Sequence, residues 1–212
     1  MSRNIIFKCL CVLNYYVVFA QMNQFDMQNT TTLDIVISKG NDGSNPYEGS
    51  PYLDDRFYMA KVNEYNDSYP VRYNASEDRM EVKVSENRVI ALDHLKTDYV
   101  VSFLESGTVY KTIDFNGTKG YFIEIWEGDN IFLLKKVSVK YFPEKESTNG
   151  YSPAKPARFV RQKDVYYVKK ENDFIEVPNN VNKLGKMLKR NDLKTLAKND
   201  GLDISEESDL IK

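Results

Sequence analysis

The chain has 212 residues, of which 42% are apolar and 28% are charged, so it can form a hydrophobic core and is not expected to be disordered as a whole. Its 29 basic and 31 acidic residues give a net charge of -2, which argues against a nucleic-acid-binding protein. One histidine and two cysteines leave few side chains for a transition-metal site, and no cofactor is predicted.

Residues 1–20 have the pattern of a secretory signal peptide. Arg3 and Lys8 are the only charged residues, and a mostly apolar run from Cys9 leads to Ala20, a small residue suited to cleavage. The run is about a dozen residues long, shorter than the roughly 20 that a transmembrane helix needs. We therefore expect cleavage after Ala20 and export to the periplasm, the envelope or the outside. A buried N-terminal helix or strand is the alternative.

Cleavage at this position would remove both cysteines, Cys9 and Cys11. The mature chain would then have no disulfide, no thiol nucleophile and no cysteine-ligated metal. No later apolar stretch approaches about 18 residues, so no transmembrane helix is expected in the mature chain.

Residues 21–50 are predicted to form a flexible N-terminal arm. Residues 33–37 are a short apolar run that fits an edge strand, and residues 39–46 are dense in turn-forming residues. Asp42 and Glu48 lie in this oxygen-rich segment and are candidates for a calcium site. The spacing of an EF-hand is absent, which favours a plain loop, so no metal site is predicted.

Residues 51–178 are predicted to form a β-rich domain. Short apolar runs at regular intervals favour an antiparallel sheet over alternating strands and helices. The clearest signal is Asn116-Gly117 between two β-type runs, which predicts a tight hairpin and, with the following run, a meander over 108–142. A sandwich, a partial barrel and a closed barrel remain open, and α+β is the alternative class. The predicted strands are 57–62, 71–73, 80–84, 88–92, 99–104, 109–115, 119–126, 131–141, 165–168 and 174–177.

Residues 179–212 are predicted to form a helical C-terminal segment packed on the β-rich domain. Val181, Leu184 and Leu188 share one helical face, Gly201 ends a second helix, and Ser205 is expected to cap a third. Residues 179–199 carry six basic side chains and one acidic side chain. Such a basic surface is suited to binding an anionic membrane or partner. A solvent-exposed face of docked helices explains the same residues and is the preferred interpretation.

The sequence offers little for catalysis, and no catalytic residue is predicted. His94 is the only imidazole and is expected at a strand end near the surface. Asp54 and Asp55 are adjacent, so in an extended chain their carboxylates point to opposite sides and do not flank one bond as in a glycosidase. An acid pair formed with a distant Glu124 or Glu127 stays open as the basis of an exported hydrolase.

Tyrosine is abundant, with 15 residues against one tryptophan. A face of tyrosines suits a sugar or an apolar ligand, although tyrosine also favours strands for structural reasons alone. The candidate ligand-binding residues are Tyr73, Tyr110, Tyr121 and Trp126.

Several short patches together resemble a group of uncharacterised exported bacterial proteins. These have a signal peptide ending in Phe-Ala-Gln, a β-rich body and a lysine-rich helical end. The patches are residues 49–55, 72–74, 119–122, 156–159 and 166–169. The resemblance implies export in a bacterial envelope context, and it implies no activity and no site residues.

The sequence thus favours a non-enzymatic exported protein that binds through its sheet face. The expected partner is an envelope protein, or a lipid-like or glycan ligand. A carboxylate-dependent exported hydrolase and a structural envelope subunit are the alternatives.

Overall fold

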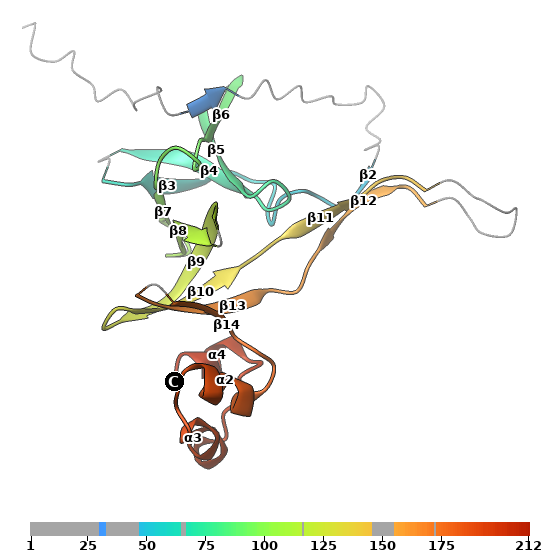
Figure 1. Ribbon diagram of the computed structural model, residues 1–212. Coiled ribbons are helices and arrows are strands. Elements are labelled where there is room, and N and C mark those ends of the chain that lie inside the picture. The colour runs from blue at the N-terminus through green and yellow to red at the C-terminus, as the bar shows by residue number, and fades with distance from the viewer. Residues whose placement is uncertain (1–29, 33–46, 65–66, 116, 146–154, 172) are drawn as a thin grey trace, which may run out of the picture.

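A computed structural model describes residues 30–32, 47–64, 67–115, 117–145, 155–171 and 173–212, and these form a mostly β protein with a short helical end (Figure 1). The predicted fold class is confirmed. The strands are β1 (Thr30–Thr32), β2 (Tyr47–Glu48), β3 (Tyr58–Val62), β4 (Ser68–Asn74), β5 (Arg79–Ser85), β6 (Arg88–Leu92), β7 (Val100–Phe103), β8 (Val109–Phe115), β9 (Thr118–Gly128), β10 (Ile131–Lys136), β11 (Val139–Phe142), β12 (Ala157–Arg161), β13 (Val165–Lys170) and β14 (Asp173–Glu176). The helices are α2 (Val181–Met187), α3 (Leu193–Asp200) and α4 (Glu207–Leu210).

Eleven strands of the described residues form one sheet in the order β1-β6-β5-β4-β3-β7-β8-β9-β10-β13-β14. The sheet is open, because β1 and β14 are its two edges. The predicted meander is present as β8, β9 and β10, and Gly117 in its first turn has a φ of 77°, in the left-handed region that glycine adopts readily. The strands predicted over 165–168 and 174–177 are present and form the hairpin of β13 and β14.

The prediction of a single strand over 131–141 is wrong, because two strands, β10 and β11, occupy this range. The chain leaves the main sheet after Lys136, and β11 begins a second sheet with the order β11-β12-β2. Val137 and Val139 stay buried against the main core, whereas Tyr141 is 48% exposed. The apolar-polar alternation continues across this point because both pieces are extended, so it does not reveal that the strand changes partners.

Three strands were not predicted from the sequence. β1 and β2 lie within the segment predicted as an arm, and β12 follows the proline-rich loop. β1 pairs with β6, and β2 pairs with β12 in parallel, so both strands are joined to the sheets. The predicted edge strand over 33–37 lies outside the described residues.

The sheet packs a hydrophobic cluster on each of its faces. The first cluster lies against β3 to β9, and there the Tyr73 and Tyr110 rings are 5.0 Å apart although two strands separate β4 from β8. The second cluster lies against β8, β9, β10, β13 and β14, and there the Phe115 and Phe174 rings are 4.6 Å apart although three strands separate β8 from β14. The sheet therefore folds back on itself twice, once on each face, and β8 and β9 take part in both folds.

A partly buried ion pair ties β10 to the β4–β5 turn. Lys136 at the end of β10 donates from Nζ to Asp78 Oδ2 at 2.5 Å and to the Tyr121 carbonyl at 2.8 Å. Asp78, in the β4–β5 turn, also accepts from the Tyr73 hydroxyl at 2.6 Å. A Cβ atom at Gly120 would collide with the Asp78 carboxylate, so the missing side chain lets this turn close against β9.

The helical segment begins and ends largely as predicted. Asn180 caps α2 by accepting from the backbone N–H groups of residues 182 and 183, and Gly201 ends α3 with a φ of 64°. The predicted cap at Ser205 is wrong, because α4 starts after Glu206 and the Ser205 hydroxyl donates to Asp203 instead. Within the described residues, no helix is both long and apolar enough to cross a membrane.

The segment is attached to the sheet through Glu207 of α4. Its carboxylate accepts from Lys135 Nζ on β10 at 2.7 Å and from the Tyr166 hydroxyl on β13 at 2.8 Å. Burial alone would raise the pKa of Glu207, but these two hydrogen bonds outweigh burial and lower the pKa. A lowered pKa stabilises the docked state above the ordinary value of 4.5, and this stabilisation is lost as the pH falls through the lowered value.

Replacing Glu207 with Gln should loosen the helical segment without unfolding the sheet. We expect amide hydrogen exchange in α2 and α3 to rise roughly fivefold at neutral pH, because a half-exposed ion pair contributes about 1 kcal/mol. Glu206→Gln, at the exposed neighbouring position, should leave exchange unchanged. Equal exchange in the two variants would show that Glu207 does not hold the segment.

Candidate functional site

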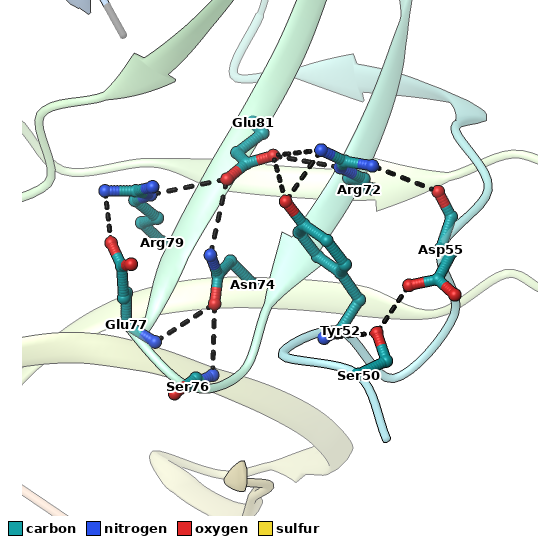
Figure 2. A network of polar contacts seen from close by, with 9 residues as sticks. All are labelled: Ser50, Tyr52, Asp55, Arg72, Asn74, Ser76, Glu77, Arg79 and Glu81. Carbon is teal, nitrogen blue, oxygen red and sulfur yellow. Dashed lines mark hydrogen bonds and ion pairs between the residues drawn. The ribbon is translucent and has the colours of Figure 1, made fainter. Parts of the chain in front are cut away.

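The most buried charge in the described residues is Glu81 on β5, whose exposed fraction is 0%. Its carboxylate faces Arg72 on β4, the cross-strand partner of Glu81, with Arg72 Nη2 at 2.8 Å from Glu81 Oε2 (Figure 2). Arg79 Nε lies at 3.4 Å from the carboxylate and the Tyr52 hydroxyl at 3.2 Å, and Asn74 Nδ2 donates at 3.4 Å. Each carboxylate oxygen therefore has donors around it.

Residues 50–57 cover this network from outside the sheet. The Arg72 guanidinium lies 3.8 Å from the Tyr52 ring centroid and 4.4 Å from that of Phe57, and Arg72 Nη1 donates to the Asp55 carbonyl at 3.2 Å. Burial, and then the Glu81 carboxylate, raise the pKa of Tyr52 to about 12, so Tyr52 keeps its proton at neutral pH. The network fixes the position of the covering segment, and Glu81 is closed off from solvent and substrate.

Beside this network, a small cavity of about 140 Å³ opens at the end of the first cluster. Tyr58, Tyr73, Tyr110 and Phe103 form its aromatic wall, and Asp54 lies at its rim. Asp54 accepts from Arg56 Nη2 at 2.8 Å and from the Tyr58 hydroxyl at 2.6 Å, and these hydrogen bonds hold its pKa well below the ordinary value. The Asp54 carboxyl thus stays ionised and is unsuited to donate a proton as a general acid.

The structure brings together three of the four aromatic residues predicted to bind a ligand. Tyr73, Tyr110 and Tyr121 lie in the first cluster, with exposed fractions of 5%, 6% and 1%. Trp126 is 42% exposed and is not part of this group. Tyr73 and Tyr110 reach the small cavity, whereas Tyr121 packs within the core beside His94, at 5.1 Å between ring centroids. Ligand binding by these residues stays a prediction.

Two of the predicted acidic candidates, Glu124 and Glu127, lie together beside Lys111. Both pair with this lysine, Asp55 accepts from Ser50, and Glu48 is exposed on β2. Asp42 lies outside the described residues. Among the described residues there is also no group of three or more His, Cys, Asp or Glu side chains placed to hold a metal ion.

A larger groove, of about 500 Å³, lies between β8 on one side and β10 and β13 on the other. Ile113, Phe132 and Leu134 give it an apolar floor that belongs to the second cluster. Small-molecule sites typically enclose about 300–1,000 Å³ with mostly apolar linings and a few polar groups, so this groove has a suitable size and surface. The further lining residues are Asp98, Lys111, Thr112, Asp114, Lys119 and Lys169.

Three lysines border the groove, and they differ in their partners. Lys111 pairs with Glu124, and Lys119 Nζ lies 2.9 Å from Asp98. Burial alone would lower the pKa of Lys111, but the contacts with Glu124 and Glu127 outweigh burial and raise it, so Lys111 stays charged. Lys169 Nζ lies over the Phe132 ring at 5.3 Å, and it forms no ion pair with any residue that the structure describes. Lys169 is therefore the cation available to an anionic ligand.

The sequence reasoning missed this groove because its residues come from strands far apart in the chain. Lys169 and Phe132 are cross-strand partners on β13 and β10. In the sequence, however, neither can be distinguished from an ordinary strand residue. The pairing of β10 with β13 is what creates the site. Comparisons with family models, curated proteins and solved structures found no match, so no relative assigns a function to the groove.

Replacing Glu81 with Gln should be strongly destabilising. The substitution keeps the side-chain shape but leaves the Arg72 guanidinium, which is 14% exposed, without its counter-charge. We expect urea denaturation to show a loss of about 3 kcal/mol in the free energy of unfolding. Glu77→Gln removes an exposed partner of Arg79 and should cost less than about 1 kcal/mol. Similar losses in both variants would contradict the role given to Glu81.

Proposed function

We propose that the protein is an exported, non-enzymatic binding protein whose sheet groove holds a ligand with an apolar body and an anionic group. The observation that carries the proposal is the apolar floor of Ile113, Phe132 and Leu134 with the unpaired Lys169 at its edge. The apolar body would cover the floor, and the anionic group would become the counter-charge of Lys169. A long-chain carboxylic acid has this chemistry.

Binding is preferred to hydrolysis because the carboxylates near the cavities are already engaged. Asp54 is held by Arg56 and Tyr58, and Asp98 pairs with Lys119. A glycoside hydrolase needs one carboxyl group that can donate a proton and a second one across the scissile bond. The described residues give more support to a site that positions a charge than to one that transfers a proton.

The groove can be tested with cis-parinaric acid, a fluorescent fatty acid, and with its uncharged methyl ester. Lys169→Gln should weaken binding of the acid roughly tenfold, because one charge-assisted contact is lost, and should leave binding of the ester unchanged. Lys170→Gln, at the next position of β13 on the opposite side of the strand, is the matched control and should bind both probes like the wild type.

Fluorescence titration decides between the outcomes. Equal weakening of acid and ester by Lys169→Gln would indicate damage to the fold and not loss of a counter-charge. An absence of saturable binding by the wild-type protein would overturn the groove as a ligand site.

Export is tested by the mass of the protein isolated from its own host. Cleavage after Ala20 predicts a mature chain that begins at Gln21 and contains no cysteine. Native mass spectrometry of the envelope fraction should show this mass, with an added mass in the lipid range if the groove is occupied. An intact chain that begins at Met1 in the cytoplasmic fraction would refute export.

A further inference from the structure

The second sheet forms an arm beside the main body (Figure 1). The arm is defined here by its described residues, 139–145 and 155–163. β11 and β12 pair in antiparallel fashion from Val139 to Phe142, and the short β2 adds to the far side of β12. β11 and β2 are the edges of this sheet, so no further strand of the described residues continues it on either side.

Both faces of the arm carry apolar side chains that are open to solvent. On one face, the Phe159 ring contacts the Tyr47 and Tyr141 rings, each at 5.0 Å between centroids, and Tyr141 is 48% exposed. On the other face, Val160 is 37% exposed next to Phe142. On the first face, Val139 is buried and Phe159 packs against the first hydrophobic cluster, so the core covers part of that face, whereas Tyr141 and Val160 stay exposed.

The arm is also strongly basic in a protein whose net charge is negative. Its described residues contain six basic side chains and one acidic side chain, Glu144, and two further carboxylates lie beside it, Glu48 on β2 and Asp164. Arg161 pairs with Asp164, and the other five form no ion pair among the described residues. Two of these five, Lys140 and Arg158, lie over the Phe142 ring at 5.3 and 5.5 Å. The six basic residues are Lys140, Lys145, Lys155, Arg158, Arg161 and Lys163.

We propose that this arm binds the surface of a membrane that contains anionic phospholipid. Lysine and arginine next to a membrane are attracted to anionic headgroups, and tyrosine is favoured at the interface between headgroups and acyl chains. In the arm both features occur on the same few strands. Five cations that have no counter-charge among the described residues are complementary to a surface of phosphate groups.

The presence of apolar side chains on both faces favours a membrane over a protein partner. A protein docks on one face of a sheet and leaves the other face in water. A narrow sheet that lies in the headgroup region meets the same surroundings on both faces, so Tyr141 and Val160 are removed from water together. The proposal concerns a surface separate from the groove and does not depend on a ligand there.

The basic helical segment is the competing surface, and it supplies a matched control. Lys183 and Lys186 of α2 are exposed and, like Lys140 and Arg158, form no ion pair among the described residues. Reversing two charges on the arm (Lys140→Glu with Arg158→Glu) and two on the helix (Lys183→Glu with Lys186→Glu) changes the net charge of the protein equally. Only the position of the change differs between these two variants.

The experiment is co-sedimentation of the chain from Gln21 with vesicles. The vesicles contain either phosphatidylcholine alone or equal parts of phosphatidylcholine and phosphatidylglycerol. The wild type should bind the anionic vesicles, more weakly as salt is added, and should bind the neutral ones poorly. The arm variant should bind the anionic vesicles roughly thirtyfold or more weakly, whereas the helix variant should stay within about twofold of the wild type.

Thermal unfolding midpoints equal to that of the wild type would show that both variants are folded. A second measurement detects insertion: Val160→Trp in a Trp126→Phe background should shift its fluorescence to shorter wavelength on anionic vesicles. Equal binding to neutral and anionic vesicles, loss of binding in the helix variant alone, or no fluorescence shift would each overturn the proposal.

Discussion

Strand β9 packs against hydrophobic clusters on both of its faces, and the arrangement of the main sheet depends on this. Tyr121 and Ile123 point into the first cluster, and Phe122 between them points into the second. Because successive side chains of a strand alternate between faces, three consecutive apolar residues require cover on both sides. The sheet supplies this cover by folding back in opposite directions on either side of β8 and β9. The small aromatic cavity and the larger groove consequently belong to different clusters.

Two polar networks hold the β4–β5 hairpin in position. In one network Asp78 accepts hydrogen bonds from Lys136 and Tyr73. In the other, the Glu81 carboxylate is surrounded by the donors Arg72, Arg79, Tyr52 and Asn74 (Figure 2). A buried carboxylate such as that of Glu81 is costly unless donors surround it, and Asp78 is only partly buried. Arg72, Asn74 and Arg79 belong to the hairpin itself, whereas Tyr52 and Lys136 come from elements distant in the chain. A hairpin placed differently would lose the contacts with Tyr52 and Lys136, so these two side chains favour one arrangement of the folded sheet.

Local sequence patterns predict the strands that have one buried face and one solvent-exposed face. They miss the elements whose burial or pairing depends on residues distant in the chain. Alternation predicts β5, and Asn-Gly predicts the β8–β9 hairpin. Within β5, however, Glu81 occupies the position of a solvent-facing residue, and it is buried only because residues 50–57 cover it. β12 gives no alternation signal, since Phe159 and Val160 are apolar neighbours on opposite faces and both are partly exposed. Its pairing with β11 defines it as a strand.

Two physical properties of the arm have opposite effects on its association with other strands. Open edges and exposed aromatic rings favour association with other strands, and like charges on the edges oppose it. Lys140 on the edge strand β11 meets this need, and Arg158 on the central strand β12 adds positive charge to the same face, which by itself would account for a basic arm. It does not account for Tyr141 and Val160 exposed on opposite faces, because a sheet that only had to stay soluble would carry polar side chains there. The positive charge opposes association of the arm with other strands in water. The exposed apolar residues favour its transfer from water to a surface of opposite charge.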